Sequence, residues 1–287
     1  MKFETNAIHG GKDENKEKIE KRETLWGSTI NMASTFPVKE FGVSQDYEYS
    51  RVSSPTRNDL EKVMAKLENG KYAFAFSSGM ATTTSLFTIF KGGDHIILGM
   101  DIYGGTYRII HDMYSKFGLE YSFVDTTNLE NIKNAVKKNT KAIFIETPSN
   151  PLLDVTDIKG VVKIAKEHNL LTIADNTFMT PYLQKPLDLG IDIVIHSATK
   201  FLSGHHDILA GIAVTNDDEI AEKLGFSQVA VGALISPFDS WLLMRSLKTL
   251  KVRVEEAQKN TEKLVKFFEN HPAVETVLYP AYESNKG

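Results

Sequence analysis

The sequence predicts an α/β protein with a mainly parallel sheet, and two patterns in the 287-residue chain support this prediction. Short apolar runs alternate with segments of helical periodicity, which is typical of folds in which strands are joined by crossover helices. Several of these runs are apolar on both faces, as strands are when helices cover both sides of a parallel sheet. A long helical pattern follows near the C-terminus, where a second domain is expected to begin.

The predicted strands are short, and most of them are separated by a segment long enough for a helix. We expect strands at residues 72–76, 95–98, 121–124, 142–145, 170–174, 191–195 and 211–214, and a further strand at residues 273–278. Because helix-length connections join most of these strands, we expect most of them to run parallel in one sheet.

Amphipathic segments between the strands predict helices. Apolar side chains share one helical face over residues 60–67, 129–136 and 158–165, and the first of these helices is expected to end before Gly70, as its cap. From Ser236 through Phe268 the pattern predicts one long helix. We therefore divide the chain as follows: an N-terminal arm at residues 1–48, a large domain at 49–245, and a linker helix with the start of a truncated C-terminal domain at 246–287.

Composition excludes several classes of function. There are 33 Lys and Arg against 37 Asp and Glu, with both signs interspersed, so we expect neither nucleic acid nor a membrane as a partner. The densest charge run, residues 12–23, mixes both signs and is expected to be a solvated arm. The absence of cysteine removes disulfides and thiolate chemistry. Because the N-terminus has no apolar leader and no run is long enough to span a membrane, we expect a cytoplasmic protein.

Three polar motifs follow predicted strands, which is where ligands bind in open α/β sheets. Residues 77–82 open a helix, so the amides near Ser78, Gly79 and Met80 can face a phosphate. Asp175 follows the strand at residues 170–174 and can pair with a protonated ring nitrogen. The Ser197-Ala198-Thr199-Lys200 motif adds two hydroxyls and an amine after the strand at residues 191–195.

Each motif has an ordinary explanation when taken alone, because a Ser-Ser-Gly turn, a turn-capping aspartate and a solvated lysine are all common. Their order along the chain, each at a strand end, favours one shared site. A lysine that forms an imine, hydroxyls that bind a phosphate and an acid that pairs with a pyridine nitrogen are the groups that pyridoxal 5'-phosphate requires. The sequence therefore predicts this cofactor. No metal is predicted at His205-His206-Asp207, because adjacent histidines point apart and no third ligand is evident.

Ordered motifs run along nearly the whole chain, at residues 7–11, 34–36, 49–51, 55–57, 67–70, 77–81, 103–108, 146–151, 175–177, 197–200, 237–242 and 245–250. Together they resemble the Cys/Met-metabolism (trans-sulfuration) family of pyridoxal-phosphate enzymes, which includes cystathionine γ-synthase, cystathionine β- and γ-lyases, methionine γ-lyase and O-acetylhomoserine sulfhydrylase. The resemblance implies the fold of aspartate aminotransferase, which is pyridoxal-phosphate fold type I, with an incomplete C-terminal domain in this chain.

The resemblance also implies roles for individual residues. Lys200 would be the Schiff-base lysine and the base that removes the substrate Cα proton. Tyr103 would stack on the cofactor ring and move protons at the leaving group. Further cofactor-binding residues would be Asp175 as the partner of the ring nitrogen, Asn150 near the phenolic oxygen, Ser78, Gly79, Met80, Ser197 and Thr199 around the phosphate, and Thr177. Tyr49 and Arg51 resemble the pair that reaches the phosphate of a neighbouring subunit, so we expect a homodimer or homotetramer.

The implied activity is β- or γ-elimination, or γ-replacement, at a C–S or C–O bond of cystathionine or an O-acylhomoserine. Residues 104–108 and 239–242 most resemble the cystathionine γ-synthase/β-lyase branch. Methionine γ-lyase and O-acetylhomoserine sulfhydrylase are the alternatives, although Gly105 stands where several methionine γ-lyases have cysteine, and Ser54 replaces the family's usual asparagine.

The end of the chain raises alternatives from other classes. The resemblance places the arginine that binds the substrate α-carboxylate beyond Gly287, so one alternative is a truncated fragment that binds pyridoxal phosphate without turnover. A structural protein on the same scaffold, with no cofactor, is a further alternative.

Overall fold

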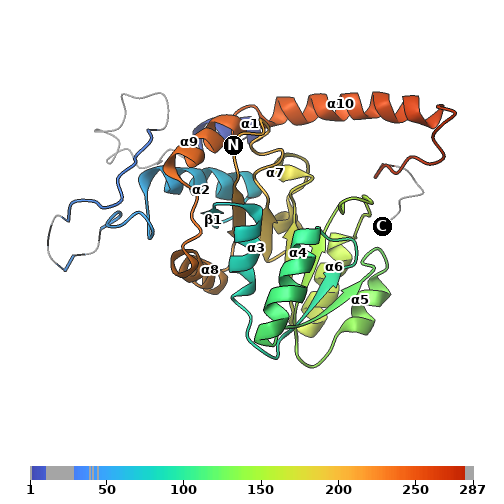
Figure 1. Cartoon of the computed structure of the whole chain (residues 1–287), viewed down its shortest axis with the longest axis horizontal. Coiled ribbons are helices and arrows are strands. Elements are labelled where there is room, and N and C mark those ends of the chain that lie inside the picture. The colour runs from blue at the N-terminus through green and yellow to red at the C-terminus, as the bar shows by residue number, and fades with distance from the viewer. Residues whose placement is uncertain (1, 11–28, 39, 41, 44, 282–287) are drawn as a thin grey trace.

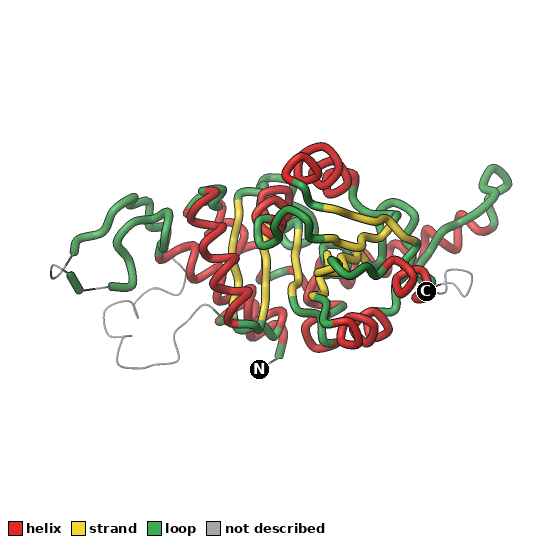
Figure 2. The backbone as a smooth tube through the Cα atoms, turned by 90° about the horizontal axis from the view of Figure 1, so that it is seen from below, coloured by secondary structure: helices red, strands yellow, loops and turns green. Residues whose placement is uncertain are grey.

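The computed structural model describes residues 2–10, 29–38, 40, 42–43 and 45–281, and a seven-stranded sheet forms its centre. Helices cover both faces of this sheet (Figures 1 and 2). The charged segment predicted to be a solvated arm, residues 12–23, lies outside the described residues, as do other parts of the predicted N-terminal arm.

The sheet is mainly parallel, as predicted. Its strands are β1 (Tyr72–Phe76), β2 (His95–Gly99), β3 (Glu120–Val124), β4 (Thr140–Glu146), β5 (Leu171–Asp175), β6 (Ile193–His196) and β7 (Gly211–Thr215), in the spatial order β1-β7-β6-β5-β4-β2-β3. Strand β7 runs antiparallel to both of its neighbours, and the pairs from β6 to β3 are parallel. The carboxyl ends of β4, β5 and β6 therefore meet at one edge of the sheet.

The helices follow the predicted segments in most places. They are α1 (Phe3–His9), α2 (Pro55–Glu68), α3 (Gly79–Phe87), α4 (Gly104–Arg108), α5 (Leu129–Ala135), α6 (Ile158–His168), α7 (Thr180–Leu183), α8 (Asp218–Val231), α9 (Pro237–Leu247) and α10 (Leu250–Glu269), with short 3-10 or π turns at Ile109–Met113, Tyr114–Phe117 and Pro186–Leu189.

Both ends of α2 have identifiable caps. Ser54, at the position where the resembling family has asparagine, accepts a hydrogen bond from the Arg57 N–H through its hydroxyl, so serine serves as the N-cap. At the other end Asn69 adopts the left-handed conformation with φ 58°. The prediction that Gly70 caps this helix is therefore wrong by one residue, because asparagine also tolerates this conformation. Gly70 instead lies against Val214, where a Cβ would approach the valine Cγ1 to 2.3 Å.

Two apolar cores lie on opposite faces of the sheet, because successive strand residues point to opposite sides. On one face Ile143 and Val194 belong to the cluster that includes α2 and α6 residues. On the other face Phe144 and Ile195 belong to the cluster that includes α3 and α8 residues. The strands are thus covered on both sides, as the continuous apolar runs predicted.

The C-terminal helical pattern is interrupted, in contrast to the single helix predicted from Ser236 to Phe268. Thr249 leaves the helical conformation with φ −108° and ψ 7°, and this separates α9 from α10. The Arg253 guanidinium donates to the carbonyl oxygens of Ser246 at 2.9 Å and Phe201 at 2.7 Å. It thereby adds a donor to the Ser246 carbonyl, which also accepts from the Thr249 N–H at 3.2 Å, and such a long-range contact cannot be anticipated from periodicity.

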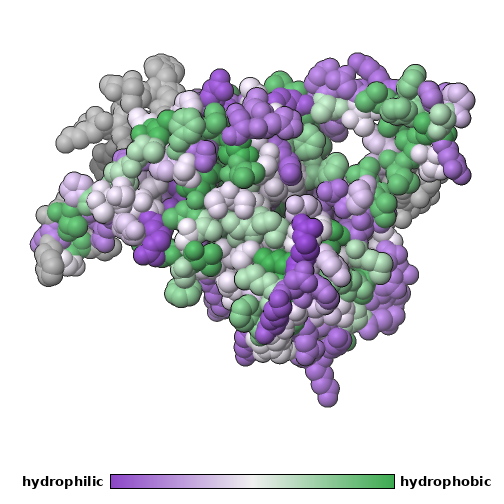
Figure 3. Space-filling model, in the orientation of Figure 1, coloured by the Kyte–Doolittle hydropathy of each residue, from purple (hydrophilic) through white to green (hydrophobic). Residues whose placement is uncertain are grey.

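The predicted strand at residues 273–278 is also wrong, because this segment is irregular. Helix α10 carries it away from the sheet, so it has no strand to pair with (Figure 1). Apolar residues gather on the surface near the end of α10 in Figure 3, where Leu264, Phe267 and Leu278 are each at least half exposed. Among the described helices, none is both long and apolar enough to cross a bilayer.

Removing the ring of Phe144 should destabilise the fold. This residue of β4 is fully buried and its ring lies 6.0 Å from that of Phe87. We predict that Phe144→Ala lowers the free energy of unfolding by about 3–5 kcal/mol in urea titrations. Phe226→Ala, at a side chain that is 75% exposed, is the matched control and should change it by less than about 0.5 kcal/mol. Equal losses in both variants would contradict this placement of the core.

Candidate active site

One cavity of about 370 Å³ lies at the carboxyl ends of β4, β5 and β6 and against the N-terminus of α3. It is lined by Ser78, Gly79, Met80, Thr83, Tyr103, Thr106, Glu146, Asn150, Asp175, Thr177, Phe178, Ile195, Ser197, Thr199, Lys200, Phe201 and Leu209. All the predicted site residues except Tyr49 and Arg51 are in this set. The structure therefore brings together groups that are more than a hundred positions apart in the sequence.

The N-terminus of α3 forms one wall of the cavity. Ser78 caps this helix through its hydroxyl, which accepts a hydrogen bond from the Ala81 N–H at 3.0 Å. The first N–H groups of a helix have no partner inside it and attract anions. Gly79 permits a close approach to the next wall, since a Cβ there would lie 2.7 Å from the Ser197 Cβ. This end of the cavity can hold an anionic group such as a phosphate.

Two hydroxyl residues after β6 face the same end. The Ser197 N–H donates to the Thr177 Oγ1 at 2.7 Å, which joins the segments that follow β6 and β5. The Thr199 hydroxyl donates to the carbonyl of Ala210 at 3.2 Å and accepts from its N–H at 3.1 Å. Backbone contacts thus hold both residues at the cavity wall.

Asp175 ends β5 and lines the cavity. Its Oδ1 accepts hydrogen bonds from the Thr177 N–H at 3.0 Å and the Thr177 hydroxyl at 2.5 Å. Burial raises the pKa of Asp175, while the bonds from Thr177 and the nearby His196 oppose this rise. A buried carboxylate in this setting gains most from a cationic partner, such as a protonated ring nitrogen.

Glu146 lies beside Asp175 and was not among the predicted site residues. The two acids are paired in register across β4 and β5. Burial, with the charge of Asp175 as a second cause, raises the pKa of Glu146 to about 8. Its Oε2 accepts a hydrogen bond from the Tyr103 N–H at 2.8 Å, so it holds the backbone of the tyrosine. A polar residue directly after the predicted strand at 142–145 was the available signal, since the same reasoning identified Asp175.

Tyr103 and Gly105 fit together at the entrance to α4. A Cβ on Gly105 would lie 2.4 Å from the Tyr103 Cε1 and 2.6 Å from the Met80 Sδ. The tyrosine ring therefore occupies space that only glycine leaves free. Tyr103 is 43% exposed as a residue and lines the cavity, so its ring is available to a flat ligand.

Lys200 and Asn150 complete the predicted set within the cavity, and both are exposed. The Lys200 backbone N–H donates to the Ser197 carbonyl at 3.2 Å in a turn that directly follows β6. Its amine is the one nucleophilic nitrogen among the side chains that line this cavity. Asn150 follows the cis peptide bond between Thr147 and Pro148 and precedes a second one at Pro151.

Tyr49 and Arg51 lie outside the cavity lining. The Arg51 guanidinium carbon lies 5.3 Å from the centre of the Tyr49 ring, and its Nη1 donates to the Val229 carbonyl at 3.0 Å. Tyr49 is 42% exposed. The pair thus lies together on the surface and does not line the cavity of its own chain.

Comparisons with known proteins point to one family. Residues 4–287 match the model of the family described as "Cys/Met metabolism PLP-dependent enzyme". The chain is 50% identical over 258 residues to "Cystathionine beta-lyase MetC" of Bacillus subtilis, which covers 90% of this chain and 66% of the relative. It is 46% identical over 289 residues to "Cystathionine gamma-lyase" of the same organism, covering 100% of this chain and 74% of that relative.

A solved structure agrees with these matches. The structure of cystathionine gamma-lyase from Lactobacillus plantarum complexed with L-serine superimposes with a TM-score of 0.94 at 45% identity, covering 99% of this chain and 73% of the other. This chain thus spans between about two thirds and three quarters of the length of these relatives.

The raised pKa of Glu146 should make the stability of the ligand-free protein fall as pH rises. An acid with a pKa of about 8 when folded, against a usual value of 4.5, keeps its proton in the folded state over that range. Stability is therefore lost progressively from about pH 4.5 to about pH 8 and stays low above it. We predict that Glu146→Gln, which can still accept from the Tyr103 N–H, is more stable than the wild type at pH 9 by about 1–3 kcal/mol.

Urea unfolding at pH 5 and pH 9 measures this difference. Glu167→Gln, at an exposed position of α6, is the control and should shift stability little at either pH. A difference between Glu146→Gln and the wild type that is the same at both pH values would show that Glu146 does not titrate in this way.

Proposed function

The chain belongs to the Cys/Met metabolism family of pyridoxal-phosphate-dependent enzymes, and on that premise we propose that it catalyses elimination or replacement at a C–S or C–O bond of cystathionine or an O-acylhomoserine. One observation carries this proposal. A single cavity combines the amine of Lys200, the carboxylate of Asp175 and the N-terminus of α3. These are the amine, acid and anion-binding groups that the cofactor requires.

The donor set of the cavity fits pyridoxal phosphate from one end to the other. The N-terminus of α3, with Ser78, Gly79 and Met80, and the hydroxyls of Ser197 and Thr199 would hold the phosphate. Asp175, oriented by Thr177, would pair with the ring nitrogen, and the 2.5 Å bond from the threonine hydroxyl fixes the carboxylate for this task. Tyr103 would stack on the ring, Asn150 would lie near the phenolic oxygen, and Lys200 would provide the amine.

Different residues of the chain would then carry out the separate proton-transfer steps. When bound, pyridoxal phosphate supplies an electron sink that stabilises negative charge at the substrate Cα. Lys200, exposed on the cavity wall, would take the Cα proton. Asp175 would keep the proton on the ring nitrogen through its negative charge. Tyr103, whose backbone Glu146 holds, would exchange a proton with the leaving group.

The proposal covers both elimination and replacement and does not choose between these two reactions. The relatives include proteins named cystathionine beta-lyase, gamma-lyase and, at 42% identity, probable gamma-synthase of Herpetosiphon aurantiacus. All three names refer to cystathionine, which the lyases cleave and the synthase forms, so together they support trans-sulfuration chemistry. Gly105 favours these activities over methionine γ-lyase.

We also propose that the enzyme works as a homodimer or homotetramer in the cytoplasm. The exposed position of Tyr49, and of Arg51 outside the cavity of its own chain, supports donation of this pair to a neighbouring subunit. A guanidinium can then bind the phosphate with two hydrogen bonds. The absence of cysteine is compatible with a reducing compartment.

Lys200 should be the residue that binds the cofactor covalently. We predict that borohydride reduction of the protein with pyridoxal phosphate labels the peptide with Lys200, and that Lys200→Ala removes both this label and the visible absorption of the bound cofactor. Peptide mass spectrometry and absorption spectra measure the two effects. Lys163→Ala, at an exposed position of α6, is the control and should keep both. Labelling that survives in Lys200→Ala would refute the assignment.

Product analysis tests the reaction itself. The cofactor-loaded protein is incubated with cystathionine, with methionine, or with an O-acylhomoserine and cysteine. We expect pyruvate or 2-oxobutyrate from cystathionine, or new cystathionine from the third mixture, as identified by mass. A folded, cofactor-loaded protein that yields none of these products would instead support a fragment that binds the cofactor without turnover.

A further inference from the structure

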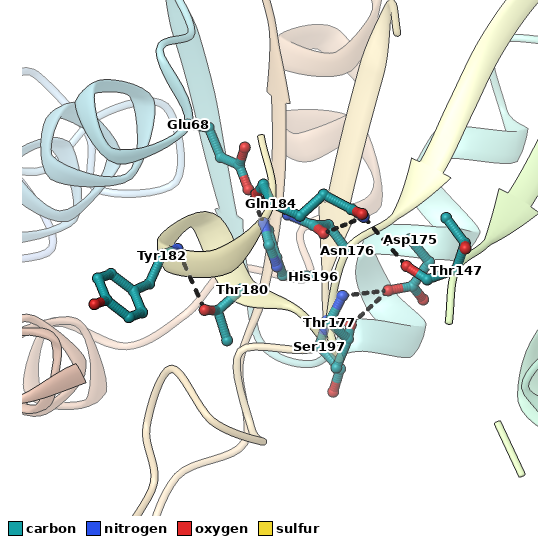
Figure 4. Close-up of polar contacts among 10 residues, drawn as sticks. All are labelled: Glu68, Thr147, Asp175, Asn176, Thr177, Thr180, Tyr182, Gln184, His196 and Ser197. Carbon is teal, nitrogen blue, oxygen red and sulfur yellow. Dashed lines mark hydrogen bonds and ion pairs between the residues drawn. The ribbon is translucent and has the colours of Figure 1, made fainter. Parts of the chain in front are cut away.

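The ends of β5 and β6 carry polar residues on both faces of the sheet. Asp175 and Ile195 are paired in register and line the cavity on one face. Their neighbours in the sequence, Asn176 and His196, are fully buried and contact Glu68, which comes from α2 on the opposite face (Figure 4). Groups on the second face are therefore one residue away from groups of the cofactor site.

Glu68 joins these two strand ends through a single oxygen. It is the last residue of α2, and its side chain is fully buried. Its Oε1 accepts a hydrogen bond from the Asn176 Nδ2 at 3.0 Å and lies 2.6 Å from the His196 Nε2. One bond fixes the residue after Asp175, and the other fixes the residue before Ser197. Their common acceptor thus fixes the spacing between the ring-nitrogen partner and the phosphate wall.

The same network reaches the end of β4 through Gln184. The Gln184 Nε2 donates to the Asn176 Oδ1 at 3.0 Å and to the Thr147 carbonyl at 3.2 Å, and the Asn176 Nδ2 also donates to the Gln184 carbonyl at 2.8 Å. Thr147 directly follows Glu146. All three strands that supply the cavity floor are therefore connected behind it (Figure 4).

Packing alone does not account for this arrangement. The Glu68 Oε2 and the His196 Nδ1 are buried without a hydrogen-bond partner among the described residues. Unpartnered buried polar atoms are costly, and apolar side chains often fill such a space with equal or better stability. A carboxylate at this place therefore calls for an explanation other than stability, and its two bonds to strand ends provide one.

We propose that Glu68 is a positioning residue for the cofactor site, acting through Asn176 and His196 from the opposite face of the sheet. The proposal rests on the proposed function, because it concerns the site that would hold pyridoxal phosphate. Without the carboxylate, the ends of β5 and β6 lose their common acceptor. Asp175 and Ser197 then shift relative to each other, and the ring and phosphate ends of the ligand are no longer both accommodated.

Three variants at α2 separate positioning from general stability. Glu68→Ala removes the shared acceptor, whereas Glu68→Gln keeps an oxygen that can accept both bonds and removes the charge. Met64→Ala removes a fully buried side chain from the same helix that the network does not use. The readouts are the dissociation constant of pyridoxal phosphate, the visible circular dichroism of the bound cofactor, and hydrogen exchange at the Asn176 and Ser197 amides of the ligand-free protein.

We expect Glu68→Ala to weaken cofactor binding by about tenfold or more, because a small misplacement within a site has effects of that order. It should also alter the circular dichroism and speed exchange at both amides. Glu68→Gln should largely restore all three readouts. Met64→Ala should lower the unfolding temperature yet leave them close to the wild type. If Glu68→Ala does not fold, Asn176→Ala and His196→Gln test the two arms separately.

The proposal is overturned if Glu68→Ala, or in its place Asn176→Ala, binds the cofactor as the wild type does, or if Met64→Ala produces the same losses. Wild-type protein that binds no pyridoxal phosphate would refute the proposed function instead. In that case the amide exchange of the ligand-free variants still decides whether Glu68 holds the two strand ends.

Discussion

The parallel register of β4, β5 and β6 is the constraint on which the rest of the site depends. Glu146 pairs with Asp175, and Asp175 pairs with Ile195, so three strands end at the same level and on the same face. Because side chains alternate along a strand, a slip of one residue would turn Asp175 away from the cavity and towards the α2 core. The apolar cores on the two faces specify this register, since each strand must place different side chains in each core.

The cavity is electrically polarised as a consequence of this arrangement. Two acidic side chains stand at the ends of β4 and β5, while the N-terminus of α3 presents unpaired N–H groups and a positive dipole end. A ligand with a cationic ring and an anionic substituent matches both ends at once. Burial is the main reason that the pKa of Glu146 is raised, and repulsion from the neighbouring carboxylate of Asp175 adds to it.

The sequence predicted the sheet well because each strand is an apolar run bounded by polar residues. Most of the residues proposed for the site line one cavity, because their motifs follow those strands. The sequence could not predict Glu68 as part of the site, because its neighbours Asn176 and His196 meet it only after the sheet and α2 have packed. The strand predicted at residues 273–278 is wrong for a related reason. The β-branched and apolar residues at 273–278 favour a strand, but a strand requires a partner edge, and this segment has none beside the described sheet.

Gly105 has a consequence for how related proteins can differ from this one. The space that a Cβ at this position would need is occupied by the ring of Tyr103 on one side and the sulfur of Met80 on the other. A homologue with a larger residue here would need a different orientation of the aromatic ring at position 103, or a smaller side chain in place of Met80. The size of residue 105 is therefore coupled to the positions of Tyr103 and Met80. A larger residue introduced here alone would displace the tyrosine ring and would not simply change the substrate selectivity of the protein.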